Sequence, residues 1–368
     1  MNNLHTDAIS GETAAWYAGD RKEVWHHLGQ YTPEAKNLHD VKRLAHLTFN
    51  AYKHPLFARP EAINGKVQPI LEIPDKVAIF RDDTGAYLGT VGDGYTVIQI
   101  DDMFSFVDDV LRAEAGAHYS AAGALGKGER VWIAAAIPQS VKIHGTQDEH
   151  KSFLMFVNAF DGSMNGIAKL VDTRPVRQNT ISIALGESGS MFRFRHTKNV
   201  QARMQAAKDA WTGITQEVER LNAKLNTLAA RKVTRETYVA IMDRLFPINK
   251  DAEFQTRRDN LLAAIAERYE YNDNNAIPEI QGTAYNLLNA VTEYTDHLRT
   301  ARLTEGRKAD GYTIERARAE NAVFDSGAKL KTDALNVILE LTATAPPNRN
   351  VGASSGIGHE VVAELLNA

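Results

Sequence analysis

The sequence predicts an α+β protein, in which an antiparallel β-rich N-terminal half with packed helices precedes a mostly α-helical C-terminal half. Residues 67–160 contain short runs of β-branched and aromatic residues separated by turn sequences, whereas apolar residues after position 199 recur with helical spacing. A basic stretch, residues 169–200, joins the two patterns. We expect four segments: an N-terminal helical and extended segment at 1–60, a mainly antiparallel β region at 61–198, an α-helical region with a long heptad-patterned helix at 199–343, and a flexible tail at 344–368.

Composition limits the possible functions. The chain has 368 residues, of which 43% are hydrophobic, so it can bury a sizeable core and exceeds a single small module. The formal net charge of -4 excludes a uniformly basic nucleic-acid coat, so a site for polyanions must be a local patch. The absence of cysteine excludes disulfides, thiolate metal sites and thiol catalysis, and fits a reducing compartment. Because no signal-peptide pattern and no apolar run near the roughly 20 residues of a membrane span occur, we expect a cytoplasmic protein without a membrane partner.

The N-terminal segment contains one predicted helix, residues 40–52, which Pro55 ends. The adjacent His26 and His27 point in different directions on any regular element, so they form a poor ligand pair. We expect no metal site here.

Local signals predict the elements of the β-rich half. Residues 77–81 and 86–91 flank a turn sequence and form a predicted hairpin with Gly85 in a left-handed conformation. Asp101 is the expected N-cap of an amphipathic helix. Further strands are expected at residues 129–137, 141–144 and 152–160. The last of these is apolar on both faces, so it belongs inside a covered sheet.

The basic stretch contains the candidate binding residues. Residues 163–235 include 13 Lys and Arg against 5 Asp and Glu, an excess of 8 positive charges in a chain whose total is -4. Residues 191–196 alternate with period two, which places Phe192 and Phe194 on one face of a strand and Arg193 and Arg195 on the other. A segregated cationic face suits binding to a phosphate backbone. The candidate nucleic-acid-binding residues are Lys169, Arg174, Arg177, Asn179, Arg193, Arg195, His196 and Lys198.

A structural interpretation of the basic stretch stands beside the functional one. The arginines can instead pair with acidic groups elsewhere in the fold, since weak surface ion pairs are common. No RNP, KH or zinc-finger spacing accompanies the stretch. Residues 179–185, before Gly186, are compatible with a short helix.

An apolar seam with alternating steps of four and three residues follows the basic stretch. Four consecutive heptads of this kind predict a long helix that packs against other helices with a left-handed crossing. The seam packs either within the chain or against a second copy, which would give a homo-oligomer. Packing within the chain is favoured, because helices are predicted downstream at residues 237–246, 251–271, 283–303 and 319–342. The seam consists of Val200, Met204, Ala207, Trp211, Ile214, Val218, Leu221, Leu225 and Leu228.

The tail contains a glycine-rich sequence, residues 351–358, that resembles the cofactor turn of short-chain dehydrogenases. That turn functions only between the first strand and helix of a βαβ unit, with an acidic residue roughly 20 positions further on. Only ten residues follow Gly358, so we interpret the sequence as a linker with a short helix at 360–366 and expect no cofactor.

No catalytic motif is present, and we expect no catalytic residue. A nuclease would need clustered carboxylates to hold Mg²⁺. The available residues, Asp82, Asp83, Asp161 and Asp172, form no D-x-D or E-x-K arrangement in a strand context.

Several short motifs, taken together, resemble a known family. In chain order they are Trp25-His26 with Leu28-Gly29, Val171-Asp172-Thr173 and Val176 before Gln178-Asn179-Thr180, Arg195-His196-Thr197, Gly282-Thr283-Ala284-Tyr285, Asn289-Ala290-Val291-Thr292-Glu293-Tyr294 with Asp296-His297, and Ala322-Val323-Phe324 with Lys329-Leu330-Lys331. Over about residues 16–342 the sequence resembles the phage/plasmid-like family of the domain of unknown function 932. It departs from the pattern at Arg174, an extra basic residue. The resemblance implies a mobile element in a bacterial host, but it carries no established activity and therefore no catalytic residue.

These observations favour a phage or mobile-element protein that binds nucleic acid, with single-stranded DNA and a role in strand annealing or recombination as the expected case. The alternative is a non-catalytic interaction protein that acts on a host or replication factor through its helical half.

Overall fold

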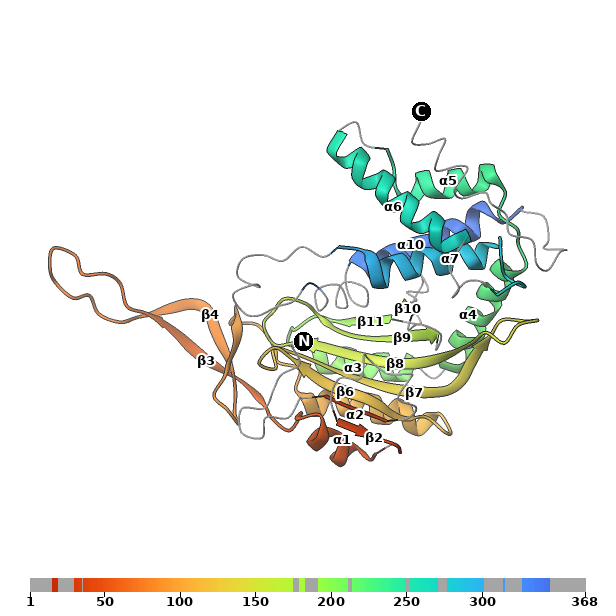
Figure 1. Ribbon diagram of the computed structural model, residues 1–368. Helices are drawn as coiled ribbons and strands as arrows, with labels where there is room; N and C mark the ends of the chain where they lie inside the picture. The colour runs from red at the N-terminus through yellow and green to blue at the C-terminus, as the bar shows by residue number, and fades with distance from the viewer. Residues whose placement is uncertain are drawn as a thin grey trace. The chain divides into compact units, whose positions relative to one another are not determined.

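The chain combines sheets and helices in an α+β fold, as predicted. A computed structural model, shown in Figure 1, describes residues 15–18, 30–34, 36–174, 179–182, 191–210, 214–248, 252–270, 277–300, 314 and 326–344. Contacts divide the chain into two compact units. Unit 1 comprises Met1–Pro138, Phe153–Lys169 and Met191–Gly213, and unit 2 comprises Gln139–Ser152, Leu170–Ser190 and Ile214–Ala368.

The described strands form two sheets. One is 8-stranded with the order β10-β9-β8-β7-β6-β1-β2, in which β11 also pairs with β9, and the other is 3-stranded with the order β3-β4-β5. Every pairing whose register is defined is antiparallel, apart from the parallel pair of β1 and β2. The strands are β1 (Ala15–Ala18), β2 (Gln30–Thr32), β3 (Ala51–Ala58), β4 (Leu71–Arg81), β5 (Tyr87–Gly92), β6 (His118–Leu125), β7 (Arg130–Lys142), β8 (Glu149–Ala159), β9 (Gly166–Arg174), β10 (Asn179–Ser182) and β11 (Met191–Phe194).

Most described helices after position 199 belong to unit 2. The helices are α1 (Leu38–Leu44), α2 (Ile100–Ala113), α3 (Val200–Ala210), α4 (Ile214–Ala229), α5 (Arg235–Leu245), α6 (Ala252–Glu270), α7 (Ala284–Glu293) with the π-helix η2 (Tyr294–Leu298), and α10 (Ser326–Leu341). All ten residues of α7 are buried, and α4, α6 and α10 contact this helix. Helix α7 is therefore the core element of unit 2.

Three local predictions are wrong. The helix expected at residues 40–52 ends at Leu44, because His46 adopts a left-handed conformation with φ 54, and β3 begins at Ala51. The two strands expected at residues 129–137 and 141–144 are one continuous strand, β7. Residues 179–182 form strand β10 rather than a helix, because they pair with β9.

The helix predicted after Asp101 is present, but its N-cap is Gln99. The carboxylate of Asp102 accepts a hydrogen bond from the Gln99 backbone at 2.8 Å. The Gln99 side chain is held by the backbone of Ala51, to which it donates at 2.8 Å. Asp101 instead forms an ion pair with Lys42.

The predicted hairpin of β4 and β5 is confirmed, with Gly85 at φ 67. The longer hairpin that β3 and β4 form was not among the predicted elements, although Asn64-Gly65 is a typical hairpin-turn sequence. Its tip is a two-residue turn at Asn64 and Gly65, with φ values of 51 and 75, which suits a type I′ turn. Figure 1 shows this hairpin as a long two-stranded arm that projects from the rest of unit 1.

The seam occurs in two separate described helices, α3 in unit 1 and α4 in unit 2. Seven of its residues are buried: Val200, Met204 and Ala207 in unit 1, and Val218, Leu221, Leu225 and Leu228 in unit 2. The side chains of Trp211 and Ile214 lie outside the described residues. Packing within the chain thus accounts for the apolar pattern at these seven positions.

Candidate nucleic-acid interface

Strand β11 is fixed to the core of unit 1 by Phe194. This side chain is 1% exposed, and its ring lies 5.6 Å from the ring of Phe106 on α2 and 5.6 Å from that of Phe156 on β8. Phe192, on the same face of the strand, is half-buried. The period-two alternation of the sequence therefore produces the apolar anchor that it predicts.

The cations that alternate with this anchor face solvent. Arg193, Arg195 and Lys198 are all exposed. Within the part of the chain that the structure describes, the side chains of these three residues have no ion-pair or hydrogen-bond partner. The interpretation that the basic residues only form ion pairs within the fold therefore does not explain these three side chains.

His196 closes the turn between β11 and α3. Its ring stacks on the ring of Tyr95, with centroids 4.2 Å apart and an interplanar angle of 13°. Its Nδ1 lies 3.0 Å from the backbone oxygen of Thr96, and the Thr96 amide donates to the backbone oxygen of His196 at 3.0 Å. Burial lowers the pKa of His196, although the backbone oxygens of Thr96 and Met164 favour its protonated form. His196 is therefore a half-buried, mainly neutral side chain that positions the cations rather than adding to their charge.

The other candidate residues have different surroundings. Lys169 is 5% exposed and has an interaction partner, so it does not belong to the solvent-facing cationic surface. Its neighbours Ala168 and Leu170 are also buried, which shows that β9 is covered at this point. The side chains of Arg174, Arg177 and Asn179 lie outside the described residues, although the backbones of Arg174 and Asn179 pair across β9 and β10.

Not every cation of the basic stretch is unpaired. On α3, Lys208 forms an ion pair with Asp109 of α2 at 2.5 Å. Arg203 is exposed on the first turns of the same helix. The surface formed by Arg193, Arg195, Lys198 and Arg203, which we call the cationic edge, therefore lies at the β11 end of unit 1.

Asp82 and Asp83, two of the carboxylates considered for a metal site, bind different partners. Asp82 accepts hydrogen bonds from the backbone and side chain of Asn50 at 2.8 and 2.9 Å. Asp83 binds Arg81 through two contacts of 2.9 and 2.7 Å. Burial acts to raise the pKa of Asp83, but the hydrogen bond and charge of Arg81 outweigh it and the pKa lies below its usual value. The described residues contain no group of three metal-binding side chains, and the Asp172 side chain lies outside them.

Unit 2 contains a buried polar network that the sequence did not indicate. The Tyr285 hydroxyl on α7 donates to Asp148 at 2.7 Å and lies 2.5 Å from Nε2 of His150. His150 and Asp148 are 0% and 5% exposed. Tyr285 is separated in the sequence from His150 by 135 residues and from Asp148 by 137, so no local sequence signal identifies this contact.

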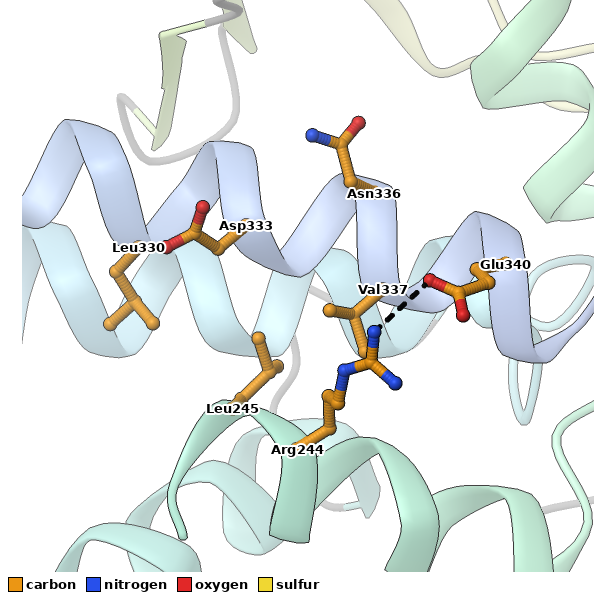
Figure 2. A pocket seen from close by; sticks show the side chains of 7 residues that line it. All are labelled: Arg244, Leu245, Leu330, Asp333, Asn336, Val337 and Glu340. Atoms are coloured by element: carbon orange, nitrogen blue, oxygen red, sulfur yellow. Dashed lines mark ion pairs between the residues drawn. The ribbon is translucent and has the colours of Figure 1, made fainter. Parts of the chain in front are cut away.

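A pocket of about 300 Å³ lies between α5 and α10 (Figure 2). The side chains of Arg244 and Glu340 form an ion pair of 3.5 Å across it, and both are more than half exposed. Leu245, Leu330 and Val337 provide its apolar part. With one paired cation and two carboxylates, this pocket lacks the features of a phosphate site.

None of the described helices is both long and apolar enough to span a bilayer.

Comparison with curated proteins finds no significant match, and comparison with solved structures finds none either. A family model described as a domain of unknown function, DUF932, matches residues 87–321, which include the cationic edge, α7 and the whole of both helices of the seam. The chain therefore belongs to the DUF932 family.

Proposed function

We propose that this protein binds nucleic acid, with single-stranded DNA as its ligand, through the cationic edge of unit 1. The observation that supports this most directly is the set of three exposed cations, Arg193, Arg195 and Lys198, that have no partner in the described part of the chain. Three unpaired positive charges within six residues repel one another, and an anionic ligand removes that cost.

The geometry suits a flexible strand. Arg193 and Arg195 are two residues apart, which separates them by about 6.6 Å along the chain. Such spacing allows contacts with neighbouring phosphates of one strand. The anchor at Phe194 keeps the backbone between them fixed, so binding costs little backbone ordering.

A biological role follows from the same proposal. A phage or mobile-element protein that holds single strands in the bacterial cytoplasm would act in strand annealing or recombination. Its binding would be independent of sequence, because phosphate contacts carry no base information.

Fluorescence anisotropy tests the proposal with the full chain and a labelled single-stranded oligonucleotide. We expect binding at low salt that weakens steeply as salt rises, because counterions are released from the phosphates. The absence of binding at low salt would contradict the proposal.

A second candidate function is supported by the arm of β3 and β4. Five large apolar side chains on the arm are more than half exposed: Phe57, Ile63, Val67, Ile70 and Leu71. Exposed apolar groups of this kind often mark protein interaction sites. If single-stranded DNA does not bind, a non-catalytic interaction protein that uses the arm becomes the better explanation.

A further inference from the structure

The three-stranded sheet of unit 1 carries a cluster of aromatic rings on one face. Register pairs Tyr52 of β3 with Phe80 of β4, and Phe80 with Tyr87 of β5. The Phe80 ring lies 6.1 Å from the Tyr52 ring at an interplanar angle of 30°, and 5.7 Å from the Tyr87 ring at 63°. His54 adds a fourth ring, 6.1 Å from Phe80. These four side chains, which we call the aromatic face, come from three adjacent strands.

The aromatic face is open to solvent, in contrast to the opposite face of the same sheet. Tyr52 and Tyr87 are 43% and 47% exposed, whereas Ile79 and Val91, on the opposite face, are 0% and 6% exposed. Cross-strand pairing explains why the rings contact one another. It leaves the outer surfaces of both tyrosine rings uncovered.

The charges around the rings favour an anionic partner. Lys76 precedes Phe80 by four residues on β4, so the strand alternation places it on the aromatic face, and it is exposed. Asp82 lies in the turn directly after β4, and both of its carboxylate oxygens already accept hydrogen bonds from Asn50.

A short segment connects the aromatic face with the cationic edge. Strand β5 begins at Tyr87 and ends at Gly92, and Tyr95 then stacks on His196, the residue after Arg195. Tyr95 follows Tyr87 by eight positions, so their Cα atoms lie at most about 29 Å apart. A single strand of several nucleotides covers that distance.

We propose that the aromatic face is a stacking platform for unpaired bases of the strand whose phosphates the cationic edge binds. This inference rests on the proposed function and specifies its ligand: a strand with accessible bases. A β-sheet that presents aromatic side chains can stack two or three bases, and such stacking tolerates any base because every base has a π-face.

The test compares two oligonucleotides of equal length by anisotropy with the full chain. One is oligo(dT), and the other has the same phosphates but abasic sites in place of bases. We expect wild-type protein to bind oligo(dT) at least tenfold more tightly, because two or three bases stack and each contributes about fivefold or more. A variant with Tyr52→Ala and Tyr87→Ala should lose this preference and keep its affinity for the abasic strand.

Two controls make the result specific. A variant with Tyr52→Phe and Tyr87→Phe keeps the rings and should keep the preference. Phe57→Ala removes an aromatic side chain of the arm that is 54% exposed, and should also leave the preference intact. Circular dichroism checks that each variant is folded.

Other outcomes overturn the inference in distinguishable ways. Equal binding of both oligonucleotides by wild-type protein would reject the platform and leave the proposed function standing. Binding of neither would reject both. If the alanine variant instead abolishes self-association in sedimentation and leaves the preference for bases unchanged, the aromatic face is an interface between two copies and not a stacking platform.

Discussion

The ring of His196 lies against the ring of Tyr95 with 4.2 Å between centroids, and this stack joins the end of β11 to the segment that follows β5. The Tyr95 hydroxyl donates to the backbone oxygen of Ala159 at 2.7 Å, so the tyrosine is itself fixed to β8. The cationic edge is thus positioned by contacts that no single part of the sequence reveals.

The stack predicts a pH dependence of stability. Burial lowers the folded-state pKa of His196 below its usual value of 6.5, so the unfolded chain binds a proton more readily than the folded one. The stabilising contribution of neutral His196 is therefore fully present above about pH 6.5, and it is lost as the pH falls through the folded-state pKa. We expect the free energy of unfolding to fall more between pH 7 and 5 in the wild type than in a His196→Asn variant, measured by urea unfolding. An NMR titration that gives His196 a pKa at or above 6.5 would contradict this.

Phe194 should be essential to unit 1. Its ring is 1% exposed between Phe106 and Phe156, so Phe194→Ala leaves a cavity and should cost about 3–5 kcal/mol of unfolding free energy. Phe192→Ala provides the matched control on the same strand face, and its half-buried side chain should cost clearly less. Denaturant unfolding measures both; equal costs for the two variants would show that β11 is not anchored as described.

Unit 2 contains a buried ion pair, and replacing only one of its two residues should destabilise the fold. Lys331 on α10 contacts Asp296 at 2.6 Å, with side chains 0% and 7% exposed. Burial lowers the pKa of Lys331, and Asp296 opposes this effect. Lys331→Met alone should cost about 3–5 kcal/mol because it removes the positive charge that compensates the buried Asp296 carboxylate, and the double variant with Asp296→Leu should recover most of the loss. Thermal unfolding of the single and double variants checks this prediction. If Lys331 contributed only packing, the second substitution would lower the stability further instead of restoring it.

The part of the candidate site that the sequence predicts is the part that depends on the alternation of apolar and basic residues along β11. The inward Phe194 and outward Arg193 and Arg195 follow from a period of two within a few residues, and the structure confirms their directions. The burial of Lys169 does not follow, because it depends on segments that cover β9 from elsewhere in the chain.

The same reason explains what the sequence does not reveal about the fold. The aromatic face requires the register of three strands, in which Tyr52 and Tyr87 are 35 residues apart, and that register is set by turns and bulges rather than by any local pattern. The helix expected at residues 40–52 has a suitable apolar pattern, but the left-handed backbone at His46 ends it early.

The salt dependence of single-stranded DNA binding tests the central claim most directly. Each phosphate contact on a single strand contributes about 0.7 to the slope of log affinity against log salt. A variant with Arg193→Ala, Arg195→Ala and Lys198→Ala should therefore bind more weakly, with a slope shallower by about two. Arg112→Ala is the matched control: Arg112 is also in unit 1 and its side chain is 74% exposed, but it is paired with Asp108, so its loss should leave the slope unchanged. If the triple variant and the wild type show the same affinity and the same slope, the cationic edge does not bind the phosphate backbone.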